Sequence, residues 1–438
     1  MKRIVAGFVL AASAPLAFAT DAATAQLLRS DIDAMYPAIE KLYTDLHQNP
    51  ELSLLEEKTA AKLAARMKAL GFEVTTGVGG TGVVAMLRNG AGPMLLVRTD
   101  MDALPVLEQT GLPYASKVTQ KVPDSGDTVP VMHACGHDVH MAAWIGTATI
   151  LAKRRDLWHG TVMFVGQPAE ERVRGAKAML ADGLYTRFGK PDVALALHDH
   201  DTTPAGSAGT IPGYIAAAVD SVDLTFHGTG GHGAYPHLTV DPILIASKFV
   251  VSVQTLVSRE LNPFDQGVVT VGSFHGGLKH NIIPDTVKLQ LTVRSYKPEV
   301  RKALLEGIER IAKAEAEAAN APRAPEMKIV ESTNATYNDP ALTEKVLAAL
   351  APVLGAENLT HPPAEMGSED FAEFVSAGVP GVYLQVGAVE PAKFALYQAG
   401  KLMLPSTHSP LFAPDVVPTL KTAILTETVA ALTLLEAK

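Results

Sequence analysis

The stretch Val131-Met-His-Ala-Cys-Gly-His-Asp-Val-His-Met-Ala-Ala143 is the point from which the rest of the chain is interpreted. It holds the only cysteine in 438 residues, so the thiol of Cys135 cannot form an intrachain disulfide. Cys135 and His137 are two residues apart, and in an extended segment their side chains point to the same side. Thiolate sulfur and imidazole nitrogen are ligands that suit zinc and similar ions. Asp138 is expected to cap an apolar helix over 139–152.

Two other interpretations fit this stretch when it is taken alone. Cys135 is an ordinary buried cysteine among surface histidines in the first, since free cysteines are often simply buried. In the second, Cys135 is a nucleophile and a histidine is its base. The choice depends on whether other ligand-type residues occur at comparable places along the chain.

Length and composition limit the classes of protein that are possible. A chain of 438 residues is too long for one ordinary core and predicts two or three domains. Apolar residues make up 47% and charged residues 19%, which is typical of a folded soluble protein. The net charge of −9 argues against nucleic acid and anionic membrane as main partners.

The N-terminus has the pattern of a secretory signal peptide. A basic start, Met1-Lys-Arg3, precedes an apolar run, and Ala17-Phe-Ala19 follows as a small-x-small cleavage site. The apolar run is too short to span a membrane. A buried N-terminal helix is the alternative. We therefore expect cleavage after Ala19 and export to the periplasm or beyond, where metal ligation would protect a free thiol from oxidation.

Polar residues follow three short apolar strands, which are predicted at 94–97, 161–165 and 193–197. A fourth such strand is predicted at 381–386. Ligands bind in open α/β sheets at the carboxyl ends of the strands. One polar cluster is therefore expected there, containing Asp100, Asp102, Cys135, His137, Glu170, Glu171 and His198.

Each member of this cluster is weak evidence when taken alone. A single histidine after a strand, such as His198, is more often structural than a ligand. Paired glutamates are more often part of a solvated surface. Glu170 and Glu171, however, follow Gln167-Pro168 in a strand-to-helix loop, where two charges need a reason.

The middle of the chain predicts a second, smaller unit. Its elements have the order β-α-β-β-α-β of a ferredoxin-like split unit. They are expected at 220–227, 241–260, 267–274, 287–296, 298–320 and 327–332. The unit is inserted into the larger α/β domain. The predicted parts are a signal peptide at 1–19, catalytic domain at 20–216, inserted domain at 217–334 and catalytic domain again at 335–438.

Nine stretches taken together form a specific signature in which the order matters as much as the residues. They are His47-Gln-Asn-Pro-Glu51, Arg98-Thr-Asp-Met-Asp-Ala-Leu-Pro105, Met132-His-Ala-Cys-Gly-His-Asp138, Gln167-Pro-Ala-Glu-Glu171, Gly230-Gly-His232, His280-Asn-Ile-Ile-Pro-Asp285, Val293-Arg294, Met366-Gly-Ser-Glu-Asp-Phe371 and His408-Ser-Pro410. The chain resembles the M20 metallopeptidases, closest to the amidohydrolase branch of hippurate hydrolases, aminoacylases and plant auxin-conjugate hydrolases.

The resemblance implies a fold and a set of roles. The fold is a mixed-sheet α/β catalytic domain with an inserted ferredoxin-like lid and dimerisation domain. Two divalent ions are implied, zinc or manganese, with cobalt or nickel also possible. Cys135 matches the ligand that bridges the ions, His137 and Glu171 match ligands of one ion, and His198 and His408 match ligands of the other.

Further residues match roles in catalysis and substrate binding. Glu170 matches the general base, and Asp102 matches the acid that orients a ligand. His232 could donate to the developing oxyanion. Arg294 could hold a substrate carboxylate in a bidentate manner, and Asn281 is a further substrate contact. Relatives are often dimers joined through the small domain, so a homodimer is expected, with His232 completing the partner's site.

The hypothesis that follows is an exported, metal-dependent hydrolase of N-acyl amino acids. A metallo-carboxydipeptidase acting on short peptides is the alternative with the same machinery. A non-catalytic metal- or amino-acid-binding protein would not need Glu170, and a thiol protease would leave Glu171, His198 and His408 unexplained. Two departures from the family's pattern, the arginines at 172 and 174 and the run 199–201, put substrate preference in doubt more than chemistry.

Overall fold

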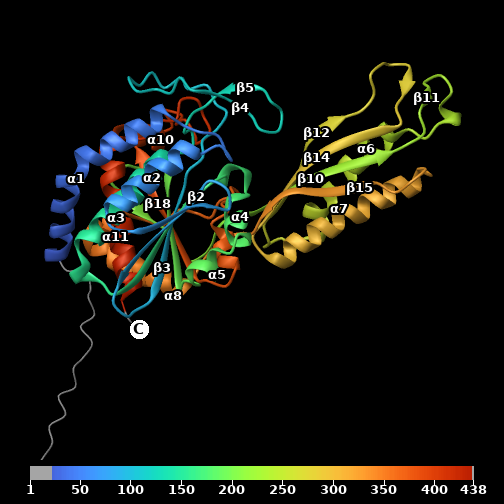
Figure 1. The fold of residues 1–438 in the computed structure, drawn as a ribbon. Helices are drawn as coiled ribbons and strands as arrows, with labels where there is room; N and C mark the ends of the chain where they lie inside the picture. The colour runs from blue at the N-terminus through green and yellow to red at the C-terminus, as the bar shows by residue number, and fades with distance from the viewer. Residues whose placement is uncertain (1–21, 437–438) are drawn as a thin grey trace, which may run out of the picture.

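The larger unit of the computed structural model is built on an eight-stranded mixed sheet (Figure 1). The structure describes residues 22–436, so the predicted signal peptide and its cleavage after Ala19 lie outside the described residues. The strand order is β1-β2-β6-β3-β7-β18-β8-β17. The bounds are Glu73–Val78 (β1), Gly82–Asn89 (β2), Gly160–Gln167 (β6), Met94–Asp100 (β3), Val193–Pro204 (β7), Gly381–Val389 (β18), Ala208–Gly209 (β8) and Leu359–Thr360 (β17).

Helices cover both faces of this sheet because its strands are apolar on both sides. In β2, Val83, Ala85 and Leu87 pack into one core, whereas Val84 and Met86 pack into another. The first core is shared with α1 (Ala22–Gln48), α2 (Glu57–Ala69), α3 (His137–Lys153), α8 (Pro340–Leu354) and α11 (Val416–Leu435). The second core is shared with α4 (Gly175–Ala181), α5 (Leu184–Phe188) and α9 (Ala372–Ser376).

Four central strands, β6, β3, β7 and β18, run parallel, so their carboxyl ends lie at one edge of the sheet. Polar residues follow β3 and β6 there, as the sequence predicts. β7 is longer than predicted, because its pairing with β18 continues through His198 and Asp199 to His200. His198 therefore projects from within a strand, which fixes its backbone.

The smaller unit is a four-stranded antiparallel sheet with two helices (Figure 1). The sheet order is β12-β14-β10-β15, and the chain order β10-α6-β12-β14-α7-β15 is the predicted one. Its apolar strand faces and helices form a separate core. The bounds are Ala218–His227 (β10), Pro242–Ser252 (α6), Gly267–His275 (β12), Thr286–Ser295 (β14), Pro298–Ala318 (α7) and Glu326–Thr333 (β15).

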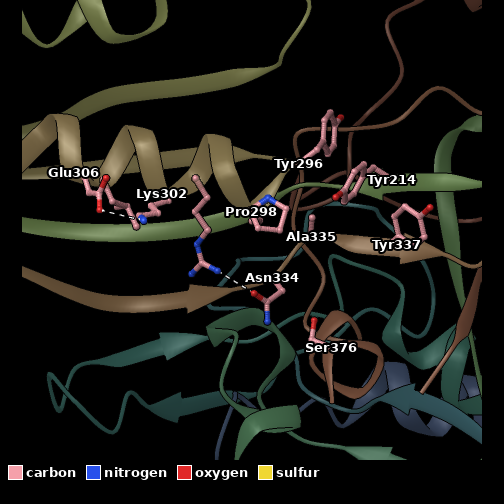
Figure 2. A pocket seen from close by; sticks show the side chains of 12 residues that line it. Tyr214, Tyr296, Pro298, Lys302, Glu306, Asn334, Ala335, Tyr337 and Ser376 are labelled. Atoms are coloured by element: carbon pink, nitrogen blue, oxygen red, sulfur yellow. Dashed lines mark hydrogen bonds and ion pairs between the residues drawn. The ribbon is translucent and has the colours of Figure 1, made fainter. Parts of the chain in front are cut away.

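Short elements complete the fold. They include the hairpin β4–β5 (Thr119–Lys121, Thr128–Pro130), the antiparallel pairs β11–β13 (Gly231–His232, Ile282–Ile283) and β9–β16 (Gly213–Ala216, Thr336–Asn338), and α10 (Pro391–Gln398). β9 and β16 lie where the chain enters and leaves the smaller unit. Tyr214, Tyr296 and Tyr337 line a cavity of about 540 Å³ at this junction (Figure 2).

The starts of two helices are set by left-handed residues before them. Leu54, with φ 72°, precedes α2, which begins at Glu57. The third helix begins at His137, with Gly136 at φ 74° before it. Asp138 therefore lies in the first turn and accepts a hydrogen bond from the side chain of His47 over 2.7 Å. Within residues 22–436, none of the helices combines the length and hydropathy that a membrane span needs.

Candidate metal and active site

The five predicted metal ligands converge at the carboxyl edge of the large sheet. Cys135 Sγ lies 3.6 Å from His198 Nε2, and His137 Nε2 lies 3.8 Å from Glu171 Oε1. His408 Nε2 lies 3.4 Å from the same Glu171 oxygen. These residues come from α3, β7, the loop after β6 and a loop near the C-terminus, so only the folded chain brings them together. All of them except His137 border a cavity of about 380 Å³.

The site contains buried polar atoms without hydrogen-bond partners. Both ring nitrogens of His137 and the Oε1 atom of Glu171 have none among the described residues. Leaving such groups unpaired in the interior is costly. The donors of Cys135, His137 and Glu171 lie within 4.8 Å of one another. Sulfur, nitrogen and carboxylate oxygen at this spacing suit a zinc-type divalent ion, so the residues present fit the implied metals.

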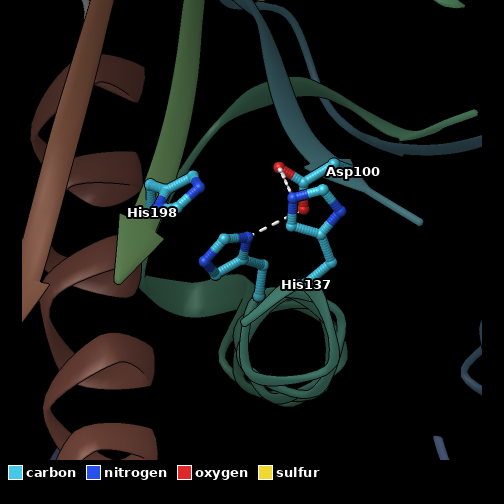
Figure 3. A group of neighbouring side chains, drawn as sticks. Asp100, His137 and His198 are labelled. Atoms are coloured by element: carbon cyan, nitrogen blue, oxygen red, sulfur yellow. Dashed lines mark hydrogen bonds and ion pairs between the residues drawn. The ribbon is translucent and has the colours of Figure 1, made fainter. Parts of the chain in front are cut away.

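Neighbouring side chains orient the two histidines. His198 Nδ1 donates to the backbone carbonyl of Asp199 over 2.6 Å, so that its Nε2 atom can act as the metal ligand. Asp102 Oδ1 lies 3.5 Å from His137 Nδ1. Figure 3 shows Asp100 at the end of β3, His137 at the start of α3 and His198 from within β7 gathered together. His140 forms hydrogen bonds to Asp100 and Asp199, at 2.8 and 3.0 Å.

The electrostatics of the site favour positive charge. Burial alone would lower the pKa of His137, but the carboxylates of Asp100 and Asp102 outweigh it and raise this pKa to about 9. In the same way, Asp199 raises the pKa of His198 to about 9 against the effect of burial. Burial, together with Glu171, raises the pKa of the Cys135 thiol. Bound cations would relieve this excess of negative charge.

Glu170 is buried beside these ligands and carries an altered pKa. Burial, followed by the nearby carboxylates of Glu369 and Glu171, raises the pKa of Glu170 well above its ordinary value. Its backbone N–H donates to Asp102 Oδ1 over 3.0 Å, and the N–H of Glu171 donates to the other Asp102 oxygen over 3.1 Å. One carboxylate therefore fixes both the proposed base and the ligand next to it.

A buried ion network lies behind Glu170. The guanidinium of Arg98 donates to Asp100 over 2.8 Å and to Glu369 over 2.7 Å, and contacts Asp370 at 3.3 Å. Arg98, His140 and Asp370 were not predicted from the sequence to belong to the site. Arg98 and Asp370 do occur within stretches that match the family, which was the only available signal.

Arg294 reaches the same cavity from β14 of the smaller unit. Its Nη1 atom donates to Ser368 Oγ over 3.0 Å, and its Nε atom donates to Thr292 Oγ1 over 3.1 Å. Among residues 22–436, no carboxylate forms an ion pair with Arg294. Burial lowers its pKa. An unpaired guanidinium facing a ligand cluster is suited to bind an anionic group.

The structure does not bring His232 and Asn281 to this cavity. His232 lies in β11 and Asn281 directly precedes β13, and this strand pair lies at the end of the smaller unit remote from the large sheet (Figure 1). His232 is exposed, and its Nδ1 accepts from the backbone N–H of Ala234 over 3.0 Å. In this arrangement neither residue meets the ligand cluster of its own chain.

The departures from the family's pattern lie at the border of the site. Arg172 and Arg174 approach Glu331 of β15 at 3.8 and 3.9 Å and so connect the two units. His200 forms a 2.5 Å contact with Glu365 in the cavity wall. Asp201 accepts the backbone N–H of Thr407 over 2.7 Å, immediately before His408.

Comparisons with known proteins show the family to which the chain is similar. The profile of peptidase family M20/M25/M40 matches residues 96–395. Thermostable carboxypeptidase 2 of Saccharolobus solfataricus is 34% identical over 375 residues, which is 84% of this chain and 91% of that protein. Hippurate hydrolase of Campylobacter jejuni is 37% identical over 343 residues, or 76% and 84%. The crystal structure of Bacillus subtilis YXEP, described as a dinuclear metal-binding M20 peptidase, has a TM-score of 0.74 and 29% identity, covering 93% of this chain and 100% of that one.

Proposed function

Because the chain belongs to peptidase family M20/M25/M40 and is a hydrolase of that family, we propose that it cleaves N-acyl amino acids into an acid and a free amino acid. The observation that carries the proposal is a cluster of buried, unpaired metal-type donors facing the unpaired Arg294. Metal ions held by the cluster would act on the scissile amide, and Arg294 would bind the carboxylate of the amino acid. Export, predicted from the N-terminal sequence, is part of the same proposal.

Two divalent ions would be held by Cys135, His137, Glu171, His198 and His408. When bound, such ions acidify a shared water and polarise the substrate carbonyl. Cys135 is the proposed bridging ligand. Asp102 and the Asp199 carbonyl keep His137 and His198 oriented toward the ions. Zinc and manganese are the proposed ions.

Glu170 is the proposed general base. Its carboxylate lies 4.0 Å from His137 Nε2, so it is beside the ligands without being needed as one. In the proposed reaction, Glu170 takes the proton of the attacking water and passes it to the departing nitrogen. Its raised pKa suits this transfer, because a general base works best when its pKa lies nearer the working pH than that of an ordinary carboxylate.

A carboxydipeptidase is the second candidate, favoured by the similarity to a thermostable carboxypeptidase. It would use the same Arg294, since a peptide substrate also ends in a carboxylate. Release of amine from N-acyl amino acids and from dipeptides, measured side by side with each metal added, separates the two candidates.

The sharpest test of the proposal is the requirement for a substrate carboxylate. N-benzoylglycine should be hydrolysed, and its carboxamide analogue N-benzoylglycinamide should be a poor substrate. Arg294→Ala should lower kcat/KM for the carboxylate substrate by about 100-fold and leave the analogue unaffected, because a charged hydrogen-bonded pair is lost. Arg310→Ala, which removes an exposed arginine of the same unit, is the control. Equal losses for both substrates would contradict the carboxylate role.

A further inference from the structure

Glu56 is a fully buried carboxylate for which the site described above has no role. It is the residue before α2, and its side chain is 0% exposed. Its Oε1 atom accepts two backbone hydrogen bonds, from Leu54 over 2.9 Å and from Ala169 over 2.8 Å. Its Oε2 atom accepts from Thr81 Oγ1 over 2.7 Å. One oxygen of Glu56 therefore links two segments that are 113 residues or more from each other in sequence.

The two backbone donors share an unusual conformation. Leu54 has φ 72° and Ala169 has φ 48°, both in the left-handed region that non-glycine residues seldom adopt. Such residues are strained and persist only where surrounding contacts hold them. Ala169 lies directly before Glu170, and Val173 after the pair is also left-handed, with φ 46°. The turn that carries Glu170 is therefore strained at both ends.

Buried carboxylates hold this turn at three successive N–H groups. Ala169 donates to Glu56, and Glu170 and Glu171 donate to Asp102. The carbonyl of Ala169 accepts from the N–H groups of Arg174 and Gly175 over 3.2 and 3.3 Å, but its own N–H has Glu56 as its acceptor. Rotation of Ala169 to a commoner φ would break that contact and turn the following Glu170 side chain. Glu56 provides the contact that prevents it.

We propose that Glu56 is a positioning residue that holds Ala169 in its left-handed conformation and so aims Glu170 at the reacting atoms. The inference rests on the proposed function for the role of Glu170. A displacement of about 1 Å at a reacting group is enough to lower turnover by about 100-fold. The effect should fall on kcat, because Glu56 touches neither the metal ligands' donor atoms nor Arg294.

Four variants test the proposal. Glu56→Ala removes all three contacts, and Glu56→Asp keeps the charge but shortens the side chain by about 1.5 Å, too far from Ala169. Glu56→Gln is the rescuing variant, because its amide oxygen still accepts both backbone N–H groups. Thr81→Val is the matched control, since it removes only the hydroxyl contact to Oε2.

Two measurements are made on each purified variant. Hydrogen exchange of a peptide spanning 166–175 should speed up at least about tenfold in Glu56→Ala and Glu56→Asp, and stay near wild type in Glu56→Gln and Thr81→Val. The value of kcat should fall about 100-fold in the first two variants with KM within about threefold, and should stay within about threefold in the other two.

The outcomes that overturn the proposal are equally definite. One is a wild-type rate of hydrogen exchange in both Glu56→Ala and Glu56→Asp. Another is a kcat for Glu56→Gln as low as that of Glu56→Ala. A third is a loss of kcat in Thr81→Val equal to that in Glu56→Ala. Failure of Glu56→Ala and Glu56→Asp to fold makes Glu56 a folding determinant and also overturns it. Hydrogen exchange separates this inference from the proposed function, because it reports on the turn even if Glu170 is not the base.

Discussion

Glu170 is buried, and the carboxylates of Asp102 and Glu56 hold the backbone around it. Its proposed role can be tested by an isosteric change. Glu170→Gln should lower kcat by about 10² to 10⁴, because the proton acceptor is lost while the shape is kept. KM and bound metal should stay near wild type, since the five ligands remain. The control is Glu365→Gln, a carboxylate in the wall of the same cavity that pairs with His200. Near wild-type turnover in Glu170→Gln would mean that the base is another group.

Cys135 should behave differently from Glu170. Cys135→Ala removes the proposed bridging ligand, so elemental analysis should find less metal per chain and kcat should fall with it. Prolonged chelation of the wild-type protein should abolish turnover, and zinc, manganese or cobalt should restore it. Full activity in protein shown by elemental analysis to be free of metal would refute the mechanism.

Among the helices, α11 carries a buried carboxylic acid, Glu427, from which a change of folding stability with pH is predicted. Glu427 is 2% exposed, and burial raises its pKa from 4.5 to about 7. The unfolded chain ionises this group from about pH 4.5, whereas the folded chain keeps it protonated to about pH 7. Between these values the folded state loses stability as pH rises, on the order of 3 kcal/mol in total.

Glu427→Gln removes this titration. The variant should match wild type below about pH 4.5 and should be more stable by up to about 3 kcal/mol above pH 7. Urea unfolding at pH 4.5 and pH 8 measures the difference. A stability difference that is the same at both values would show that Glu427 is ionised in the folded protein.

At the same scale, the sequence predicted the elements better than the contacts between them. Apolar runs predicted β3, β6, β7 and β18, and the polar residues that follow three of these runs predicted one cluster at the carboxyl ends of the strands. The sequence did not predict that α2 begins at Glu57, because no residue pattern marks Leu54 as left-handed, a conformation that leucine seldom adopts. The contact of Glu56 with Ala169 spans 113 residues, which no local periodicity encodes.

In the whole molecule, the position of the smaller unit raises the question of how His232 could act. The β11–β13 strand pair lies remote from the ligand cluster of its own chain (Figure 1). Leu244 and Val251, two helical turns apart on α6, are 56% and 72% exposed. β12 lies at an edge of its sheet, and no described strand pairs with its outer side. These features support the proposal of a homodimer joined through the smaller unit.

A two-fold dimer of this kind would build two equal composite sites, each with Glu170 from one chain and His232 from the other. His232→Ala and Glu170→Gln should each be nearly inactive alone. When they are mixed under conditions that allow subunits to exchange, half of the dimers become heterodimers, and each heterodimer contains one site with both residues intact. Activity should then return to about a quarter of the wild-type value.

The control replaces the Glu170→Gln chain by a chain that carries both substitutions. Its heterodimers with His232→Ala contain no intact His232, so activity should stay at the level of the single variants. Exchange itself is measured independently, by mass spectrometry of differently labelled chains. If exchange is complete and the first mixture still gains no activity, His232 does not act across the interface. It would then reach its own site by closure of the smaller unit, or have no part in the reaction.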